Sequence, residues 1–278
     1  MKYMIFNLEG RGGMYLYHFF VYNLGGLFYI INNKFDIRGP ENTSVLFHDK
    51  SAMVDKPSNY TTTTTNPIKI HMKNILPFQR ETFDIIKDDF ELIEDLNKIT
   101  DYEIVSIYGE TCTHSICDNP NIIYPFLRQL FLKRLNYEVI PGKRIFITRK
   151  NSESQHDGLL KRCMLNEDEM KTMLEKYNIE YIQLENYSMH EKIKLFMESE
   201  VIISTHSGCL TLCLFVNVNT KIIEILNTGT HGFNHSHYIG ICNTLGLNYN
   251  RYTDISEDHN GNFNLNLSKF EDFLNNFI

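Results

Sequence analysis

The feature that most constrains the fold is the regular alternation of apolar runs and helical stretches between residues 141 and 265. The apolar runs have the length of β-strands and lie at residues 144–148, 181–184, 201–204, 221–226 and 247–252. The stretches with helical spacing lie between them, at residues 166–177, 188–199, 207–216 and 236–245. Strand–helix–strand units form right-handed crossovers, which make the strands parallel and place helices on both faces of the sheet. The sequence therefore predicts a doubly wound, Rossmann-like α/β domain over residues 141–265.

Two helices of this domain have recognisable starts. Asn166 is followed three residues later by Glu169, and Ser188 is followed three residues later by Glu191. This is the spacing of a capping box, in which the first side chain accepts a hydrogen bond from the backbone N–H of the third helical residue. We expect both helices to begin with this motif.

Residues 1–140 alternate less regularly and are expected to form a separate N-terminal domain. Apolar spacing predicts a strand at residues 4–6, a buried helix over residues 15–31, and helices at residues 83–99 and 124–135. The remaining segment, residues 266–278, is expected to form a helix from Leu267 that packs back across the N-terminal domain.

The charge balance argues against a nucleic-acid partner. The formal net charge is −7, and no Lys/Arg-rich stretch exceeds two residues. Such a surface repels a phosphate backbone, whereas a single nucleotide needs only one or two cations in a local pocket.

The cysteines and the apolar runs predict a cytoplasmic protein. None of the six cysteines forms a CxxC pair, and this usage is typical of reduced thiols. No uninterrupted apolar run approaches the about 18 residues of a membrane span. The short apolar run at the N-terminus is better explained by a strand than by a signal peptide.

Polar side chains gather where the predicted strands end. Arg149 follows the first strand of the regular region, His206 follows the third, and Ser207 and Gly208 open the next helix. The carboxyl ends of parallel strands share one edge of the sheet, where ligands bind. Arginine binds phosphate oxygens in a bidentate manner, and a helix start without bulky side chains lets an anion approach the backbone. This edge suits a diphosphate, although Arg149 could also end a strand in solvent and His206 could be an ordinary helix-entry residue.

Two carboxylates belong to the same edge. Glu185 follows the second strand and Glu224 lies inside the apolar fourth strand. Either could hold ribose or sugar hydroxyls. Alternatively, Glu185 only precedes a helix cap, and Glu224 must have a partner or reach the edge because a buried carboxylate is costly.

The histidines suggest a base but no metal site. His18 lies in the apolar stretch near the N-terminus and is either a buried neutral histidine or a general base. His231, His235 and His237 have no carboxylate or cysteine beside them, so we expect no metal there. The chain contains no Walker, GxSxG or HExxH motif, and no GxGxxG follows a strand.

Several segments, taken in order, resemble glycosyltransferase family 61, which includes plant xylosyl- and arabinosyltransferases and animal protein O-GlcNAc transferases. They are residues 17–24, 144–149, 162–169, 185–193, 201–208, 222–225 and 237–249. The resemblance implies a metal-independent, inverting transfer of a sugar from a nucleotide-sugar donor, UDP-linked, to a glycan or protein hydroxyl. It also implies a GT-B architecture, with two Rossmann-like halves facing a cleft, the acceptor side in residues 1–140 and the donor in residues 141–265.

The resemblance assigns roles to individual residues. It adds Arg162 to the donor-binding residues, which are then Arg149, Arg162, Glu185, His206, Ser207, Gly208 and Glu224. His18 is the expected catalytic base, with Glu9 or Asp49 as alternatives. The chain departs from the family pattern at residues 206–212. The family usually has His-Gly-Ala-Gly-Leu-x-Asn there, and in this chain Leu212 replaces the asparagine. The alternatives are therefore a catalytically inactive sugar-nucleotide or glycan-binding protein of the same fold, and an unrelated Rossmann-like enzyme such as a nucleotide-utilising ligase.

Overall fold

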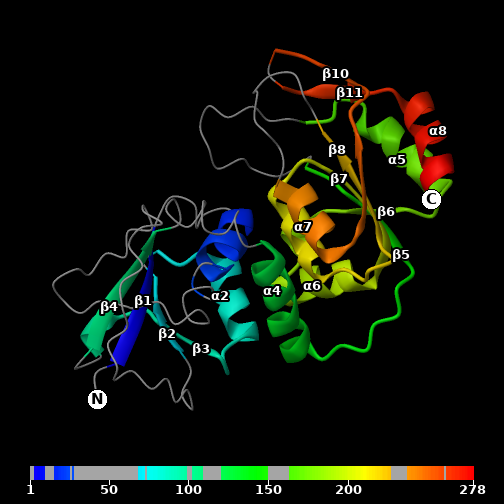
Figure 1. Cartoon of the computed structure of the whole chain (residues 1–278). Coiled ribbons are helices and arrows are strands. Elements are labelled where there is room, and N and C mark those ends of the chain that lie inside the picture. The colour runs from blue at the N-terminus through cyan, green and yellow to red at the C-terminus, as the bar shows by residue number, and fades with distance from the viewer. Residues whose placement is uncertain are drawn as a thin grey trace. The chain divides into compact units, whose positions relative to one another are not determined.

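The structure is a computed structural model of the chain and forms two compact units, residues 1–136 and 137–278. Each unit is described by itself (Figure 1). The residues described are 3–9, 16–25, 27, 68–72, 74–98, 102–108, 120–149, 163–226, 237–259 and 261–278. Within these ranges, no helix has both the length and the apolar character required to cross a membrane.

The second unit is built on a five-stranded sheet. Its strands are β5 (Lys143–Ile147), β6 (Glu180–Ile182), β7 (Ser199–Thr205), β8 (Lys221–Ile225) and β9 (Asn248–Tyr252). They lie in the order β6-β5-β7-β8-β9 and every pair is parallel. The central strands β7 and β8 are buried along almost their whole length, as expected of strands covered on both faces. The predicted parallel sheet is confirmed.

Helices cover this sheet in two groups. The helices are α5 (Glu167–Glu175), η5 (Leu184–Asn186), α6 (Met189–Glu198), η6 (Gly208–Phe215), α7 (His237–Leu245) and α8 (Leu267–Phe277). α5 packs with α8, whereas α6 and α7 both pack with η6, and the two groups lie on opposite sides of the sheet (Figure 1). The helix predicted over residues 207–216 forms, but as a 3₁₀-helix rather than an α-helix.

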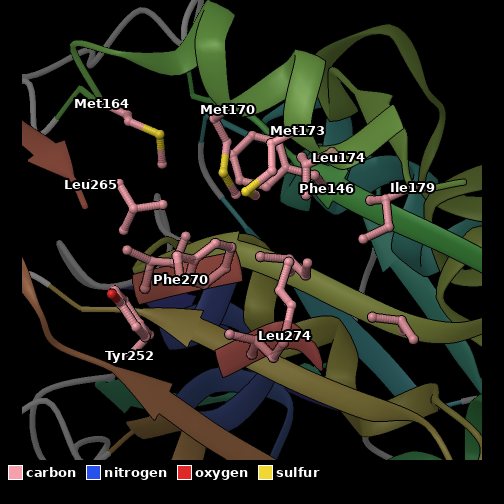
Figure 2. Close-up of a cluster of buried hydrophobic side chains, with 14 of the residues drawn as sticks. Phe146, Met164, Met170, Met173, Leu174, Ile179, Tyr252, Leu265, Phe270 and Leu274 are labelled. Atoms are coloured by element: carbon pink, nitrogen blue, oxygen red, sulfur yellow. The ribbon is translucent and has the colours of Figure 1, made fainter. Parts of the chain in front are cut away.

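The last helix, α8, packs on the second unit. Phe270 and Leu274 are fully buried and belong to the same apolar cluster as Phe146 of β5 and Met170 of α5 (Figure 2). The apolar face of α8 is therefore occupied by the second unit, and the expectation that residues 266–278 pack across the N-terminal domain stays a prediction for the rest of the helix. α5 and β5 leave an apolar surface beside them, which the last helix covers together with Phe263 and Leu265.

A hairpin that the sequence analysis did not predict connects α8 to the sheet. It consists of β10 (Ile255–Glu257) and β11 (Phe263–Leu265), which pair antiparallel. Asn166 bonds to β11 through both side-chain atoms, because its Nδ2 donates to the Leu265 carbonyl at 2.8 Å and its Oδ1 accepts from the Leu265 N–H at 3.0 Å. Asn166 consequently makes no capping hydrogen bond to α5, and the predicted capping box is wrong at this helix.

The second predicted capping box forms as expected at α6. The Ser188 hydroxyl accepts from the Glu191 N–H at 3.3 Å, and the Glu191 carboxylate accepts from the Ser188 N–H at 2.8 Å. Together these bonds satisfy two backbone donors at the start of the helix and fix where the segment after β6 turns into α6.

The first unit contains a second parallel sheet. Its strands are β1 (Tyr3–Glu9), β2 (Ile68–His71), β3 (Phe90–Ile93) and β4 (Tyr102–Tyr108), in the order β3-β2-β1-β4. Its helices are η2 (His18–Leu24), α2 (Pro77–Ile85), η4 (Leu96–Lys98) and α4 (Pro120–Leu135). The strand expected at residues 4–6 and the helix expected at residues 124–135 are confirmed.

The helix predicted over residues 83–99 does not form. α2 ends at Ile85, and the chain turns through residues 86–89 into β3. Asp88 and Asp89 of this turn both pair with Arg134 of α4, so the turn is held by an ion pair across the unit. The apolar residues on both sides of the turn have the spacing of a helix. In short apolar runs, this spacing does not distinguish a helix from a strand.

The buried helix near the N-terminus is a π-helix, η2. It lies inside the predicted range and buries nearly every side chain, among them Phe19 and Phe20. Gly25 follows it, and a Cβ atom there would lie 2.7 Å from Ile123 Cγ2 of α4. The glycine therefore permits the close approach of η2 to α4. π-Helical turns are rare and are frequent at functional sites.

Candidate functional site

The strand order of the second unit defines where a ligand should bind. Counted along the chain, the five strands lie in the order 2-1-3-4-5. The chain passes from β5 to β6 on one side and then crosses back to β7 on the other side, so the strand order reverses between β5 and β7. In doubly wound sheets, ligands bind beyond the carboxyl ends of the strands at this reversal. Arg149 lies two residues after β5 and His206 directly after β7. Two of the predicted donor-binding residues therefore flank the switch point.

Arg149 and His206 are in direct contact. The Arg149 side chain is half-buried, and its Nη1 donates a hydrogen bond to the His206 carbonyl at 2.8 Å. The backbone after β7 is fixed in turn by the His206 N–H, which donates to the Ile225 carbonyl at 3.0 Å. The guanidinium is thereby held at the turn after β7, so Arg149 is not simply a solvated strand end.

Glu224 is the partner of His206. Its carboxylate is fully buried, and Oε1 lies in hydrogen-bond contact with His206 Nδ1. The imidazole also packs on the Tyr238 ring of α7, with the ring centroids 5.2 Å apart. A buried carboxylate in an apolar strand needs a partner, and His206 is that partner for Glu224.

Two residues of β9 complete this cluster and were missed by the sequence analysis. The Tyr249 hydroxyl donates to Glu224 Oε2, and Arg251 Nε lies 3.3 Å from the same oxygen and 2.9 Å from the Tyr249 oxygen. A signal for them exists in the sequence. A carboxylate inside an apolar strand needs a cation, and Arg251 is the single basic residue of the next predicted strand, with Tyr249 two residues before it on the same face.

These contacts determine the charge state of the cluster. Burial acts to raise the pKa of Glu224, but the hydrogen bond and charge of His206, together with Tyr249 and Arg251, hold it below its ordinary value. Burial, reinforced by the negative charge of Glu224, raises the pKa of Tyr249. Glu224 is therefore ionised at neutral pH, and Tyr249 remains a hydrogen-bond donor.

The start of η6 lies beside this cluster. Ser207 is extended, and the 3₁₀-helix begins at Gly208. The Ser207 hydroxyl contacts Cys209 Sγ at 2.8 Å, and burial raises the pKa of the Cys209 thiol. Cys209 is thus a neutral polar neighbour of the helix start. The first N–H groups of a helix carry partial positive charge, which adds to the charge of Arg149 at this edge.

The remaining predicted donor-binding residues are less closely tied to this edge. Glu185 is exposed in η5. Its negative charge adds to the effect of burial in raising the pKa of the Cys209 thiol, whereas the positive charge of Arg149 opposes that effect. Arg162 lies outside the described residues, so the structure does not place it.

His18, the predicted base, lies in η2 of the first unit. It is half-buried and packs edge-on against the Tyr22 ring at 4.9 Å and the Tyr17 ring at 5.9 Å. Burial lowers the pKa of His18 below its ordinary value of 6.5. Of the alternative bases, Asp49 and the side chain of Glu9 lie outside what the structure describes.

The histidine group near α7 is only partly visible. His237 begins α7 and packs edge-on against Tyr238, whereas His231 and His235 lie outside the described ranges. Within those ranges, no group of three or more His, Cys, Asp or Glu side chains is arranged to hold a metal ion.

Fold and site together define an α/β protein with Arg149 and His206 in contact at the switch point of a parallel sheet. The sequence profile of the family described as Glycosyltransferase 61 matches residues 16–223. This match covers most of the chain and includes η2, Arg149 and His206. The chain belongs to glycosyltransferase family 61, and the resemblance noted from its motifs is confirmed. A search of curated protein sequences gives no significant match.

Proposed function

We propose that the protein transfers a sugar from a UDP-linked donor to a glycan or protein hydroxyl, with inversion at the anomeric carbon and without a metal ion. The observation that carries this proposal is the contact between Arg149 and His206 at the switch point of the five-stranded sheet. Family membership supplies sugar transfer as the reaction class, and the cationic edge supplies a place for the donor diphosphate.

The chemistry is a single in-line displacement. A base accepts the proton of the acceptor hydroxyl, and the hydroxyl oxygen forms a bond to the anomeric carbon. The bond from that carbon to the diphosphate oxygen breaks, and its electron pair stays on the diphosphate. Arg149, His206 and the N–H groups at Ser207 and Gly208 would stabilise this developing charge. They supply positive charge of the kind that a divalent cation provides in other transferases.

The first unit would supply the acceptor side. We assign the base to His18, because a histidine whose pKa is lowered by burial is neutral at pH 7 and can accept a proton. Asn23, on the same π-helix, is 1% exposed, and its Oδ1 has no hydrogen-bond partner among the described residues. A buried acceptor without a donor is costly, and an acceptor hydroxyl would satisfy it. The two units would then be the acceptor and donor halves of a GT-B enzyme.

One observation favours the alternative of an inactive binding protein of the same fold. Leu212 stands in η6 where the family's motif usually carries an asparagine, and its side chain is fully buried. A buried leucine cannot form the polar contact that an asparagine would form. Donor hydrolysis or transfer by the purified protein distinguishes the enzyme from a protein that only binds.

UDP should stabilise the protein in the presence of EDTA. At about one hundred times its Kd, a ligand that binds only the folded state adds roughly 2.7 kcal/mol to the free energy of unfolding. The measurement is the melting temperature with UDP, GDP, CMP and their sugar derivatives, with and without manganese. A protein that no nucleotide stabilises, or that responds to UDP only when manganese is present, would contradict the proposed donor site.

Arg149→Ala should weaken UDP binding far more than it weakens the fold. Loss of a charge-assisted contact to a phosphate costs about 1.5–3 kcal/mol of binding free energy. Isothermal titration with UDP measures the loss. The matched control is Arg144→Ala. Arg144 lies near the start of β5, the strand that Arg149 follows, pairs with Glu200 and is half-buried. Equal UDP affinities for both variants would remove Arg149 from the donor site.

A further inference from the structure

Glu224 is the common partner of three side chains, and the sheet register explains why. β8 and β9 pair in parallel with Ile222 opposite Tyr249 and Glu224 opposite Arg251. Residues two apart on a strand point to the same face of the sheet, so Tyr249 and Arg251 reach Glu224 on the face that carries α7 and η6. His206 approaches the same carboxylate from the turn after β7.

The three contacts divide the two carboxylate oxygens between them. Oε1 contacts His206 Nδ1, whereas Oε2 accepts from the Tyr249 hydroxyl and from Arg251 Nε at 3.3 Å. Arg251 also donates to the Tyr249 oxygen at 2.9 Å, and its guanidinium lies 5.8 Å from the centroid of the Tyr249 ring. With Oε2 held from β9, the carboxylate cannot rotate away, and Oε1 stays aimed at the imidazole.

We propose that Tyr249 and Arg251 are positioning residues that act through Glu224 to set the orientation and the tautomer of His206. An ionised carboxylate accepts a hydrogen bond only from a protonated ring nitrogen, so the proton must sit on Nδ1. Nε2 is then the nitrogen that faces a diphosphate, and it donates to the diphosphate once it also carries a proton, as an imidazolium whose charge Glu224 balances. Carboxylate–histidine pairs orient metal-bound and catalytic histidines in the same way. The inference rests on the proposed donor site for its functional consequence.

The test compares two tyrosines of one strand. Tyr249→Phe removes the hydroxyl that holds Glu224. Tyr252→Phe removes a hydroxyl three residues later, which has no hydrogen-bond partner among the described residues and belongs to the apolar cluster on the other face. Arg251→Met removes the guanidinium charge, and Arg251→Lys retains a positive charge.

Two measurements are made on each variant. Long-range proton–nitrogen NMR spectra of the imidazoles, recorded on the ligand-free protein at about pH 8 where an ordinary histidine is neutral, report the tautomer of His206. Isothermal titration reports the UDP affinity. We expect Tyr249→Phe and Arg251→Met each to shift ligand-free His206 toward the Nε2–H tautomer. Because Glu224 then no longer orients the imidazole and balances its charge, each variant should also lower UDP affinity about tenfold, the factor for one hydrogen bond to a charged group. Arg251→Lys should recover part of both losses, and Tyr252→Phe should change neither.

The outcomes separate this inference from the proposed function. If Tyr249→Phe and Arg251→Met retain the wild-type tautomer and UDP affinity, the positioning role is wrong while the donor site stands. If the wild type binds no UDP, the donor site is wrong, and the tautomer of the ligand-free variants still decides whether β9 positions His206. Melting temperatures of the variants identify any loss that reflects unfolding.

Discussion

Glu224→Leu will lower the free energy of unfolding by about 3–5 kcal/mol, because it removes one partner of a buried ionic cluster. The Glu224 side chain is completely buried, and the side chains of His206 and Arg251 are only 10% and 28% exposed. Without the carboxylate, Arg251 and the Tyr249 hydroxyl lose the oxygen that both contact. Urea unfolding at pH 7, extrapolated linearly to water, measures the change.

Glu200→Leu is the matched control. Glu200 also lies on a strand of the five-stranded sheet and also pairs with an arginine, at 2.5 Å from Arg144, but its side chain is 40% exposed. Exposed ion pairs contribute about 0–1 kcal/mol, so this variant should remain close to the wild type. A Glu224→Leu variant that loses no more stability than Glu200→Leu would show that the cluster does not support the fold.

The pH dependence of stability offers a second measurement of the same cluster. The pKa of Glu224 in the folded protein lies below its ordinary value of 4.5. Below pH 4.5, the unfolded state therefore binds the proton first, and stability falls as the pH drops toward the folded pKa. The difference in free energy of unfolding between the wild type and Glu224→Leu should have its full value above pH 4.5 and should decrease as the pH falls below 4.5. A difference that does not change with pH would show that Glu224 contributes no charge-dependent stability.

The sheet of the second unit could be predicted because its strands are short, apolar and separated by helices. The same local signals failed wherever a longer-range contact decided the outcome. Asn166 has the sequence of a helix cap, but its side chain bonds to the backbone of Leu265, ninety-nine residues away. The segment around Asp88 and Asp89 continues a helical spacing, but an ion pair with Arg134 holds it as a turn.

The site shows the same division. Arg149 and His206 could be predicted because the carboxyl ends of parallel strands meet at one edge. Tyr249 and Arg251 could be suspected as partners of a buried carboxylate, but the sequence does not give the register that places Arg251 opposite Glu224. Register is a property of the pairing between two strands and cannot be read from the sequence of either strand alone.

His18→Gln decides between a base and a core histidine, and we expect it to lower turnover by about 10²–10⁴-fold while UDP affinity stays unchanged. The expectation follows from the position of His18, which is half-buried between Tyr17 and Tyr22 on the π-helix. Because burial lowers the pKa of His18 below 6.5, wild-type turnover should rise with pH through that lowered pKa and then level off. The variant should lack this rise. Turnover, UDP affinity and melting temperature are measured on the same preparations.

His71→Gln provides the contrast, because His71 is a buried histidine of the same unit with a structural partner. Its side chain is 5% exposed, and its Nδ1 lies 2.8 Å from the Ile93 carbonyl of the neighbouring strand β3. Loss of such a buried bond costs about 1–3 kcal/mol of stability and should leave turnover per folded molecule intact. If His18→Gln behaves like His71→Gln, losing stability while retaining turnover, His18 is a core residue and the base must be sought elsewhere in the first unit. If the wild type binds UDP-sugars but neither transfers nor hydrolyses them, the alternative of an inactive binding protein replaces the enzyme.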